Sequence, residues 1–177
     1  MPDLRSELGL AAHAAGFLTR LPVPQPLDYA PELLGRSARY FVPVGLALGA
    51  LTGGVWLLAL ESGLPSLVAA VVAIGAAVAL TGGLHEDGLA DAADGLWGGW
   101  SPERRLEIMR DSRIGSYGVM ALVLGLGLRA VALALIFETG AGAAAAALIV
   151  AAMLSRAAMA GVMAALPPAR ADGLARD

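Results

Sequence analysis

Long uncharged apolar runs alternate with short charged segments along this 177-residue chain. Because a membrane-spanning helix needs about 20 predominantly apolar residues, four of the runs are long enough to cross a bilayer. These runs cover Tyr40–Leu60, Ser66–Leu84, Gly118–Phe137 and Ala143–Leu166. The pattern predicts an all-α, polytopic integral membrane protein with about four transmembrane helices.

Two further segments have the pattern of helices outside the bilayer. In Leu4–Arg20 the apolar residues recur at mixed three- and four-residue spacing, which predicts an amphipathic helix at the membrane interface. An ordinary cytosolic lead-in helix is the alternative. Before Glu103–Arg113, Ser101 and Pro102 form a typical helix start, so a short charged helix is expected there.

Composition supports a membrane protein and excludes several kinds of site. The chain is 58% hydrophobic and only 15% charged, whereas soluble domains are about a quarter charged. Its 23 glycines suit close helix packing in lipid. With no cysteine, the chain has no disulfide, thiolate metal site or thiol nucleophile.

The arginines divide the connecting segments into two classes. They lie before the first apolar run, between the second and third, and after the fourth, whereas the other two connections hold only Glu61 and Glu138. The positive-inside rule therefore predicts that both termini and the central loop are cytoplasmic. Arg129 and Arg156 fall inside apolar runs, so they are expected to face a partner or an anionic substrate, with snorkelling as the alternative.

A dense group of acids follows the second run, between His85 and Asp94. If this stretch is helical, Asp87, Asp91 and Asp94 lie within roughly 60° of one another. Carboxylates this close repel unless a cation holds them, and their oxygens suit Mg²⁺ or Mn²⁺. We therefore expect Asp87, Asp91 and Asp94, with Glu86, to bind Mg²⁺. A solvated charge cluster is the structural alternative.

Basic residues after the acids extend this chemistry to phosphate. Arg110 and Arg113 are expected to contact phosphate oxygens, with Arg36 and Arg39 as additional candidates. Acids for a metal and arginines for phosphate suggest metal-assisted phosphoryl transfer. Asp111 is a candidate catalytic base or a further ligand.

His85 is the other candidate base, and its place depends on helix geometry. On a straight helix it points almost opposite Asp87, so it joins the site only if Gly82–Gly83 or Gly88 distorts the helix. A break there could also direct a helix N-terminus at phosphate.

Three stretches, in this order, resemble the cobalamin synthase (adenosylcobinamide-GDP ribazoletransferase) family. They are FLTRLPVP at 17–24, GLHEDGLADAADG at 83–95 and LEIMRDSRIGSYG at 106–118. The resemblance implies a bacterial or archaeal inner-membrane enzyme that needs Mg²⁺. Its substrates would be adenosylcobinamide-GDP and α-ribazole, or α-ribazole 5′-phosphate. Its products would be adenosylcobalamin, or the 5′-phosphate, and GMP.

The resemblance also sets expectations for domains and partners. Residues 1–177 are expected to form a single membrane-embedded transferase domain that lacks C-terminal helices of the family. Besides the two substrates, membrane lipid is an expected partner and nucleic acid is not. A homo-oligomer is left open.

Two other functions remain as alternatives. Asp91 and Asp94, followed by Gly95, resemble the opening of the CDP-alcohol phosphotransferase signature, although the rest of that signature is missing. A cation transporter is the rival from another class. It would need acids near the bilayer midplane, whereas the charges inside the runs are arginines.

Overall fold

The computed structural model describes residues 4–23 and 31–169, and all regular secondary structure in these ranges is helical. Single 3₁₀ turns follow α2 (Ala38–Tyr40) and α7 (Phe137–Thr139). The helices are α1 (Leu4–Leu18), α2 (Pro31–Ser37), α3 (Phe41–Glu61), α4 (Ser66–Thr81), α5 (Leu84–Gly98), α6 (Pro102–Ile108), α7 (Ser116–Ile136) and α8 (Ala141–Ala165).

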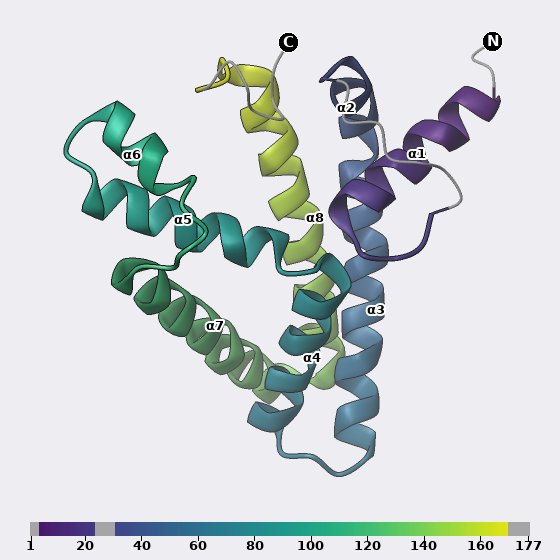
Figure 1. The fold of residues 1–177 in the computed structure, drawn as a ribbon. Helices are drawn as coiled ribbons and strands as arrows, with labels where there is room; N and C mark the ends of the chain where they lie inside the picture. The colour runs from purple at the N-terminus through teal and green to yellow at the C-terminus, as the bar shows by residue number, and fades with distance from the viewer. Residues whose placement is uncertain (1–3, 24–30, 170–177) are drawn as a thin grey trace.

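Helices α3 and α8 pack along most of their length (Figure 1). Glycines on α3 permit this close approach. A Cβ on Gly49 would lie 2.5 Å from the Ile149 Cα, and one on Gly45 would lie 2.6 Å from the Ala152 carbonyl oxygen. Small residues at such a contact let two backbones meet, which is how helices associate in lipid. The predicted role of glycine in close packing is thus seen at α3.

The outer surfaces of the long helices are apolar. Leu124 and Leu128 on α7 and Leu154 on α8 are each more than 60% exposed. Within the described ranges, three helical stretches are long and apolar enough to cross a membrane, and α4 with α5 would make a fourth if counted as one span. Apolar side chains exposed in this way suit contact with lipid, so the prediction of a polytopic all-α membrane protein is confirmed.

A sharp bend separates α4 from α5. Gly82 and Gly83 both adopt left-handed backbone conformations, with φ of 66° and 73°, which favour glycine. The axes of the two helices differ by 91°, so α5 runs across the bundle rather than along α4 (Figure 1). The second apolar run was expected to continue to Leu84, but its helix ends at Thr81 because these glycines redirect the chain.

The N-terminal segment packs against this bend. Leu18 of α1 is buried with Leu34 of α2 and Phe41 of α3. Beyond α1, the backbone N–H of Arg20 donates to the Leu80 carbonyl at 2.8 Å, and the Arg20 side chain lies against Gly82. The first and second family-like stretches therefore meet at the bend.

Helix α6 is shorter than predicted. Ser101 caps it as expected, accepting a hydrogen bond from the Arg104 N–H at 3.2 Å, but the helix ends at Ile108 instead of Arg113. The Asp111 carboxylate accepts the backbone N–H of Arg113 at 3.1 Å, a local turn that competes with helix. Helix α2, which was not predicted, begins at Pro31, a residue favoured at a first helical position.

Candidate functional site

The carboxylates after the bend lie on one regular helix, α5, which begins at Leu84. Asp87 is exposed and Asp91 is half-buried. The two residues are one helical turn apart, so their side chains are neighbours on the same face. The bend comes before the acids, and the expected shared face of Asp87, Asp91 and Asp94 is therefore preserved.

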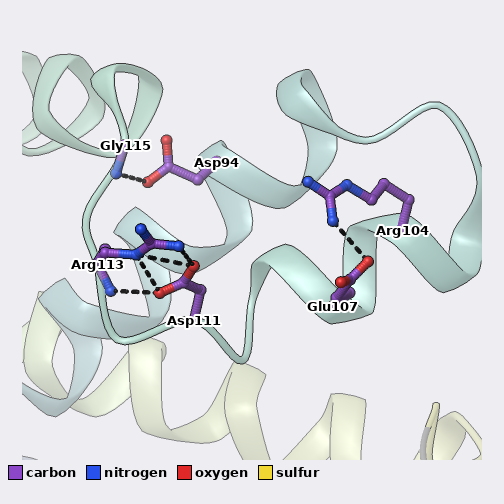
Figure 2. A network of polar contacts seen from close by, with 6 residues as sticks. All are labelled: Asp94, Arg104, Glu107, Asp111, Arg113 and Gly115. Carbon is purple, nitrogen blue, oxygen red and sulfur yellow. Dashed lines mark hydrogen bonds and ion pairs between the residues drawn. The ribbon is translucent and has the colours of Figure 1, made fainter.

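Asp94, at the far end of that face, is buried at the beginning of α7. Its carboxylate accepts hydrogen bonds from the backbone N–H groups of Gly115, at 2.7 Å, and Gly118, at 2.9 Å (Figure 2 shows the first). A Cβ on either glycine would collide with this carboxylate. The N-terminus of a helix favours negative charge, so Asp94 acts as the cap that α7 otherwise lacks.

Glu86 points to α7 from the first turn of α5. Its Oε1 pairs with Arg129 Nη1 at 3.0 Å, and its side chain is only 14% exposed. This contact joins the acid-rich stretch to an arginine that lies 43 residues away in the sequence. Arg129 therefore faces a carboxylate of the protein rather than snorkelling alone.

A cavity of about 410 Å³ lies beside this ion pair, between α3, α4, α5, α7 and α8. Its polar end is formed by six side chains, and the remainder is mainly alanine, leucine and isoleucine. The six are Thr81, His85, Glu86, Arg129, Ser155 and Arg156. The bend thus brings His85 into a site, as the broken-helix alternative required, and it does so with two arginines from the membrane helices.

Unpartnered polar atoms converge on this cavity. Of four buried side-chain polar atoms without a hydrogen-bond partner among the described residues, three belong to its lining: His85 Nε2, Glu86 Oε2 and Arg156 Nε. Arg156 is 9% exposed, and its Nη1 donates to Ser155 Oγ at 2.9 Å. Polar atoms buried in this way are costly, which marks the cavity as a place for a polar ligand.

The loop between α6 and α7 carries a separate charged group. Arg113 binds the Asp111 carboxylate through Nε and Nη2, the latter at 2.7 Å (Figure 2). This pairing lowers the pKa of Asp111 from its usual 3.8 to about 2 and raises that of Arg113. Both side chains line a second cavity of about 330 Å³, which also reaches Asp94, while Arg110 is exposed just before it.

The remaining predicted residues lie near the N-terminal helices. Arg39 pairs with Glu7 of α1 at 2.8 Å and lies over the Tyr40 ring. Arg36 is exposed on α2. Neither side chain lines the cavity that contains Arg113.

The acids of α5 fit a magnesium ion that is held jointly with a substrate. Among the described residues, no three histidine or acidic side chains form a cluster able to hold a metal ion. Mg²⁺, however, is often bound by one or two carboxylates together with substrate phosphates. Asp87 and Asp91, one helical turn apart on α5, are two carboxylates of the kind that such a donor set needs, and the Glu86 and Asp94 carboxylates contact α7 and its N-terminal residue.

Sequence reasoning expected Arg129 and Arg156 to face a partner or an anionic substrate, but it did not group them with Ser155 in one site. The position of these arginines was the basis of that expectation, because an arginine inside an apolar run requires an anionic partner. What the sequence did not indicate was that the bend would carry His85 and Glu86 to these arginines.

Comparison with known proteins agrees with this picture. A family model described as cobalamin-5-phosphate synthase (CobS) matches residues 10–177. A protein of Azorhizobium caulinodans, named adenosylcobinamide-GDP ribazoletransferase, is 52% identical over 164 residues, which cover 90% of this chain and 62% of that protein. A protein of Brucella canis with the same name is 48% identical over 170 residues, which cover 95% of this chain and 65% of that protein.

The chain thus spans less than two thirds of the length of these curated relatives. No solved structure matches it. The three family-like stretches nevertheless fall within the matched region, and the resemblance that they predicted is confirmed. The chain belongs to the cobalamin-5-phosphate synthase family.

Proposed function

We propose that this protein transfers adenosylcobinamide phosphate from adenosylcobinamide-GDP to α-ribazole or its 5′-phosphate, with Mg²⁺, and releases GMP. The names of its relatives support this reaction over CDP-alcohol transfer and cation transport. The observation that carries the proposal is the bend at Gly82–Gly83. The bend places the first turn of α5 at the cavity that contains Arg129 and Arg156. The same helix carries Asp87 and Asp91.

In this reaction a ribose hydroxyl attacks the cobinamide-side phosphorus of a pyrophosphate. The new P–O bond forms as the bond to GMP breaks, and the hydroxyl proton passes to a base. When bound, Mg²⁺ supplies charge neutralisation at the pyrophosphate. Asp87 and Asp91 are the side chains that we assign to hold it. In our proposal Glu86 and Asp94, which the sequence also favoured as ligands, position Arg129 and α7 instead.

His85 is the base in this proposal. His85 lines the cavity, and its Nε2 is buried with no hydrogen-bond partner among the described residues, so this nitrogen is not already committed to another group there. Asp111 is the weaker base of the two. Its pKa of about 2 lies far below neutral pH, and the efficiency of a general base falls as its pKa leaves the working pH.

Exposed arginines of the α6–α7 loop would bind the nucleotide part of the donor. Arg113 is held by Asp111, and Arg110 precedes it on the same loop. Phosphate oxygens match the guanidinium fork, which suits both residues to the pyrophosphate or to GMP. Arg36 and Arg39 are candidates for a more distant part of the donor.

The arginine distribution supports an inner-membrane protein with a cytoplasmic site. In Figure 1, α6 and the beginning of α3 lie toward the end of the bundle opposite the α3–α4 turn. That turn contains Glu61 and no basic residue, whereas α2 and α6 contain arginines. We therefore assign the end with α2 and α6 to the cytoplasm.

The test is transfer by the purified protein in lipid nanodiscs. Adenosylcobinamide-GDP and α-ribazole 5′-phosphate are supplied with Mg²⁺ or with a chelator, and GMP and the corrinoid product are separated by chromatography. We expect equal amounts of both products, only with Mg²⁺. The Azorhizobium caulinodans relative serves as the positive control for the assay. Product formation that is unchanged by the chelator would contradict the metal assignment, and no product where the relative is active would contradict the function.

A further inference from the structure

The cavity beneath the bend has two chemically different parts. Most of its wall is apolar and comes from α4, α7 and α8, with Ile74, Leu133 and Leu148 among its residues. Its other end holds Arg156, Arg129 and His85. A ligand that matches both parts has an apolar body and an anionic group at one end.

The charges at the polar end leave one cation to be balanced. Glu86 is paired with Arg129 at 3.0 Å, and within the described part of the chain no ion pair joins Arg156 to a carboxylate. Arg156 is nevertheless only 9% exposed, and its Nε has no hydrogen-bond partner among the described residues. Glu86 acts electrostatically on both arginines, which leaves this end of the cavity with one excess positive charge, so an anion bound against Arg156 would stabilise this arrangement.

The size of the cavity distinguishes between the two substrates of the proposed reaction. At about 410 Å³ it is at the lower end of the range for small-molecule sites. The donor carries a corrin macrocycle, an adenosyl group and GDP, and it is far too large to enter. The acceptor is a single ribonucleoside with a dimethylbenzimidazole base, which is apolar and flat.

We propose that this cavity binds the acceptor nucleotide, with Arg156 holding its 5′-phosphate and the apolar wall holding the benzimidazole ring. The inference rests on the proposed function, and it makes Arg156 a residue that determines specificity for the phosphorylated acceptor. The ribose then lies between base and phosphate, toward His85 Nε2 and Glu86 Oε2, the two unpartnered atoms able to accept hydrogen bonds from its hydroxyls.

The experiment compares binding of α-ribazole 5′-phosphate and α-ribazole to protein in phosphatidylcholine nanodiscs by calorimetry. For the unmodified protein we expect the phosphate to lower Kd by roughly tenfold to a hundredfold, as a charge-assisted contact should. Arg156→Gln should abolish this difference and leave the Kd for α-ribazole within about twofold. Arg156→Lys, which keeps the charge, should retain part of the preference. Arg104→Gln is the control, because Arg104 is exposed, pairs with Glu107 and does not line this cavity.

Each result decides the inference. An unchanged phosphate preference in Arg156→Gln would overturn it. If that variant does not fold, Arg156→Lys decides. A phosphate preference that is smaller than in the unmodified protein supports the assignment, and a preference that is unchanged overturns it.

A membrane phospholipid could present the same phosphate chemistry. Replacing phosphatidylcholine by phosphatidylglycerol should therefore leave nucleotide affinity unchanged. Weaker nucleotide binding in phosphatidylglycerol, removed by Arg156→Gln, would identify a lipid headgroup as the occupant and overturn the inference. GMP release from the donor is measured in parallel. If transfer occurs and the phosphate preference is unchanged in Arg156→Gln, only this inference is contradicted. If the unmodified protein shows no transfer and no acceptor binding, the proposed function is contradicted as well.

Discussion

The carboxylate of Asp94 accepts a hydrogen bond from the backbone N–H of Gly118, 2.9 Å away and 24 residues further along the chain. Gly115 donates to the same carboxylate at 2.7 Å. Asp94 therefore fixes the beginning of α7 against α5, and with it the ion pair between Glu86 and Arg129 that lies further along the same two helices. Asp94 thus has a structural role that is visible in its contacts.

Replacement of Gly118 should test this contact. In Gly118→Ala the new Cβ would meet the Asp94 carboxylate, so one or both hydrogen bonds must lengthen. We expect the free energy of unfolding to fall by about 1–3 kcal/mol, the usual cost of a buried polar group left without its partner. Thermal unfolding in detergent measures the change.

Gly127→Ala is the matched control on the same helix. No atom lies within 4 Å of a Cβ at Gly127, and alanine favours helix over glycine. This variant should unfold at the same temperature as the unmodified protein or higher. Equal destabilisation by the two substitutions would show that the Asp94 contact contributes nothing.

The bend makes a second prediction. Gly82→Ala meets two penalties, a left-handed φ of 66° and a collision with the Arg20 side chain, whereas Gly83→Ala meets only the unfavourable φ of 73°. Since the left-handed conformation costs an ordinary residue about 1–2 kcal/mol, both variants should be destabilised, and Gly82→Ala more so. Unfolding temperatures rank them against Gly75→Ala, which has open space around it. A smaller loss for Gly82→Ala than for Gly83→Ala would argue against packing of Arg20 on the bend.

The α3–α8 contact makes a third prediction. A Cβ at Gly49 would lie 2.5 Å from the Ile149 Cα, where only backbone movement can relieve the overlap. Gly49→Ala should therefore cost about 1–3 kcal/mol. Gly54→Ala, on the same helix with nothing within 4 Å, should be neutral or stabilising. If both variants unfold alike, the two helices do not meet at Gly49.

The Asp111–Arg113 pair predicts a specific pH dependence. The pKa of Asp111 in the folded protein, about 2, lies below its usual 3.8. The contribution of the pair is therefore fully present above pH 3.8 and is lost as the pH falls toward 2. Arg113→Gln should move the pKa of Asp111 back toward 3.8, because the guanidinium hydrogen bonds are its largest cause.

Carbon-13 NMR of labelled aspartate carboxyls in detergent micelles measures this titration. Arg39→Gln is the control, since Arg39 pairs with Glu7 and is not among the groups that lower the pKa of Asp111. An Asp111 pKa that is the same with and without Arg113 would contradict the pairing.

The long helices could be predicted from the sequence because an uncharged apolar run has few alternatives in a membrane. Helices α3, α7 and α8 each begin and end within two residues of the predicted runs. The predicted end of the second run, Leu84, lies three residues beyond the end of α4 at Thr81, because a Gly–Gly pair is compatible with either a straight or a bent helix. Only packing, here including Arg20, decides between the two.

The candidate site could be predicted only in part, and for a similar reason. The shared face of Asp87 and Asp91 follows from helix periodicity within one element. The contacts Glu86–Arg129 and Asp94–Gly118 join residues 43 and 24 positions apart, and no local spacing indicates them. Sequence reasoning therefore grouped Asp94 with the acids expected to bind Mg²⁺, whereas its contacts in the structure are with Gly115 and Gly118.

The central claim is that two aspartates on one face of α5 have different roles: Asp91 helps to hold the metal ion and Asp94 holds α7. The most direct measurement is the affinity for Mn²⁺, a spectroscopic substitute for Mg²⁺, by electron paramagnetic resonance in the presence of adenosylcobinamide-GDP. We expect Asp91→Asn to weaken Mn²⁺ binding at least about tenfold in a protein that still folds. Asp94→Asn should lower the unfolding temperature and leave the affinity of the folded protein unchanged. Mn²⁺ binding that survives in Asp91→Asn, or is lost equally in folded Asp94→Asn, would contradict the account.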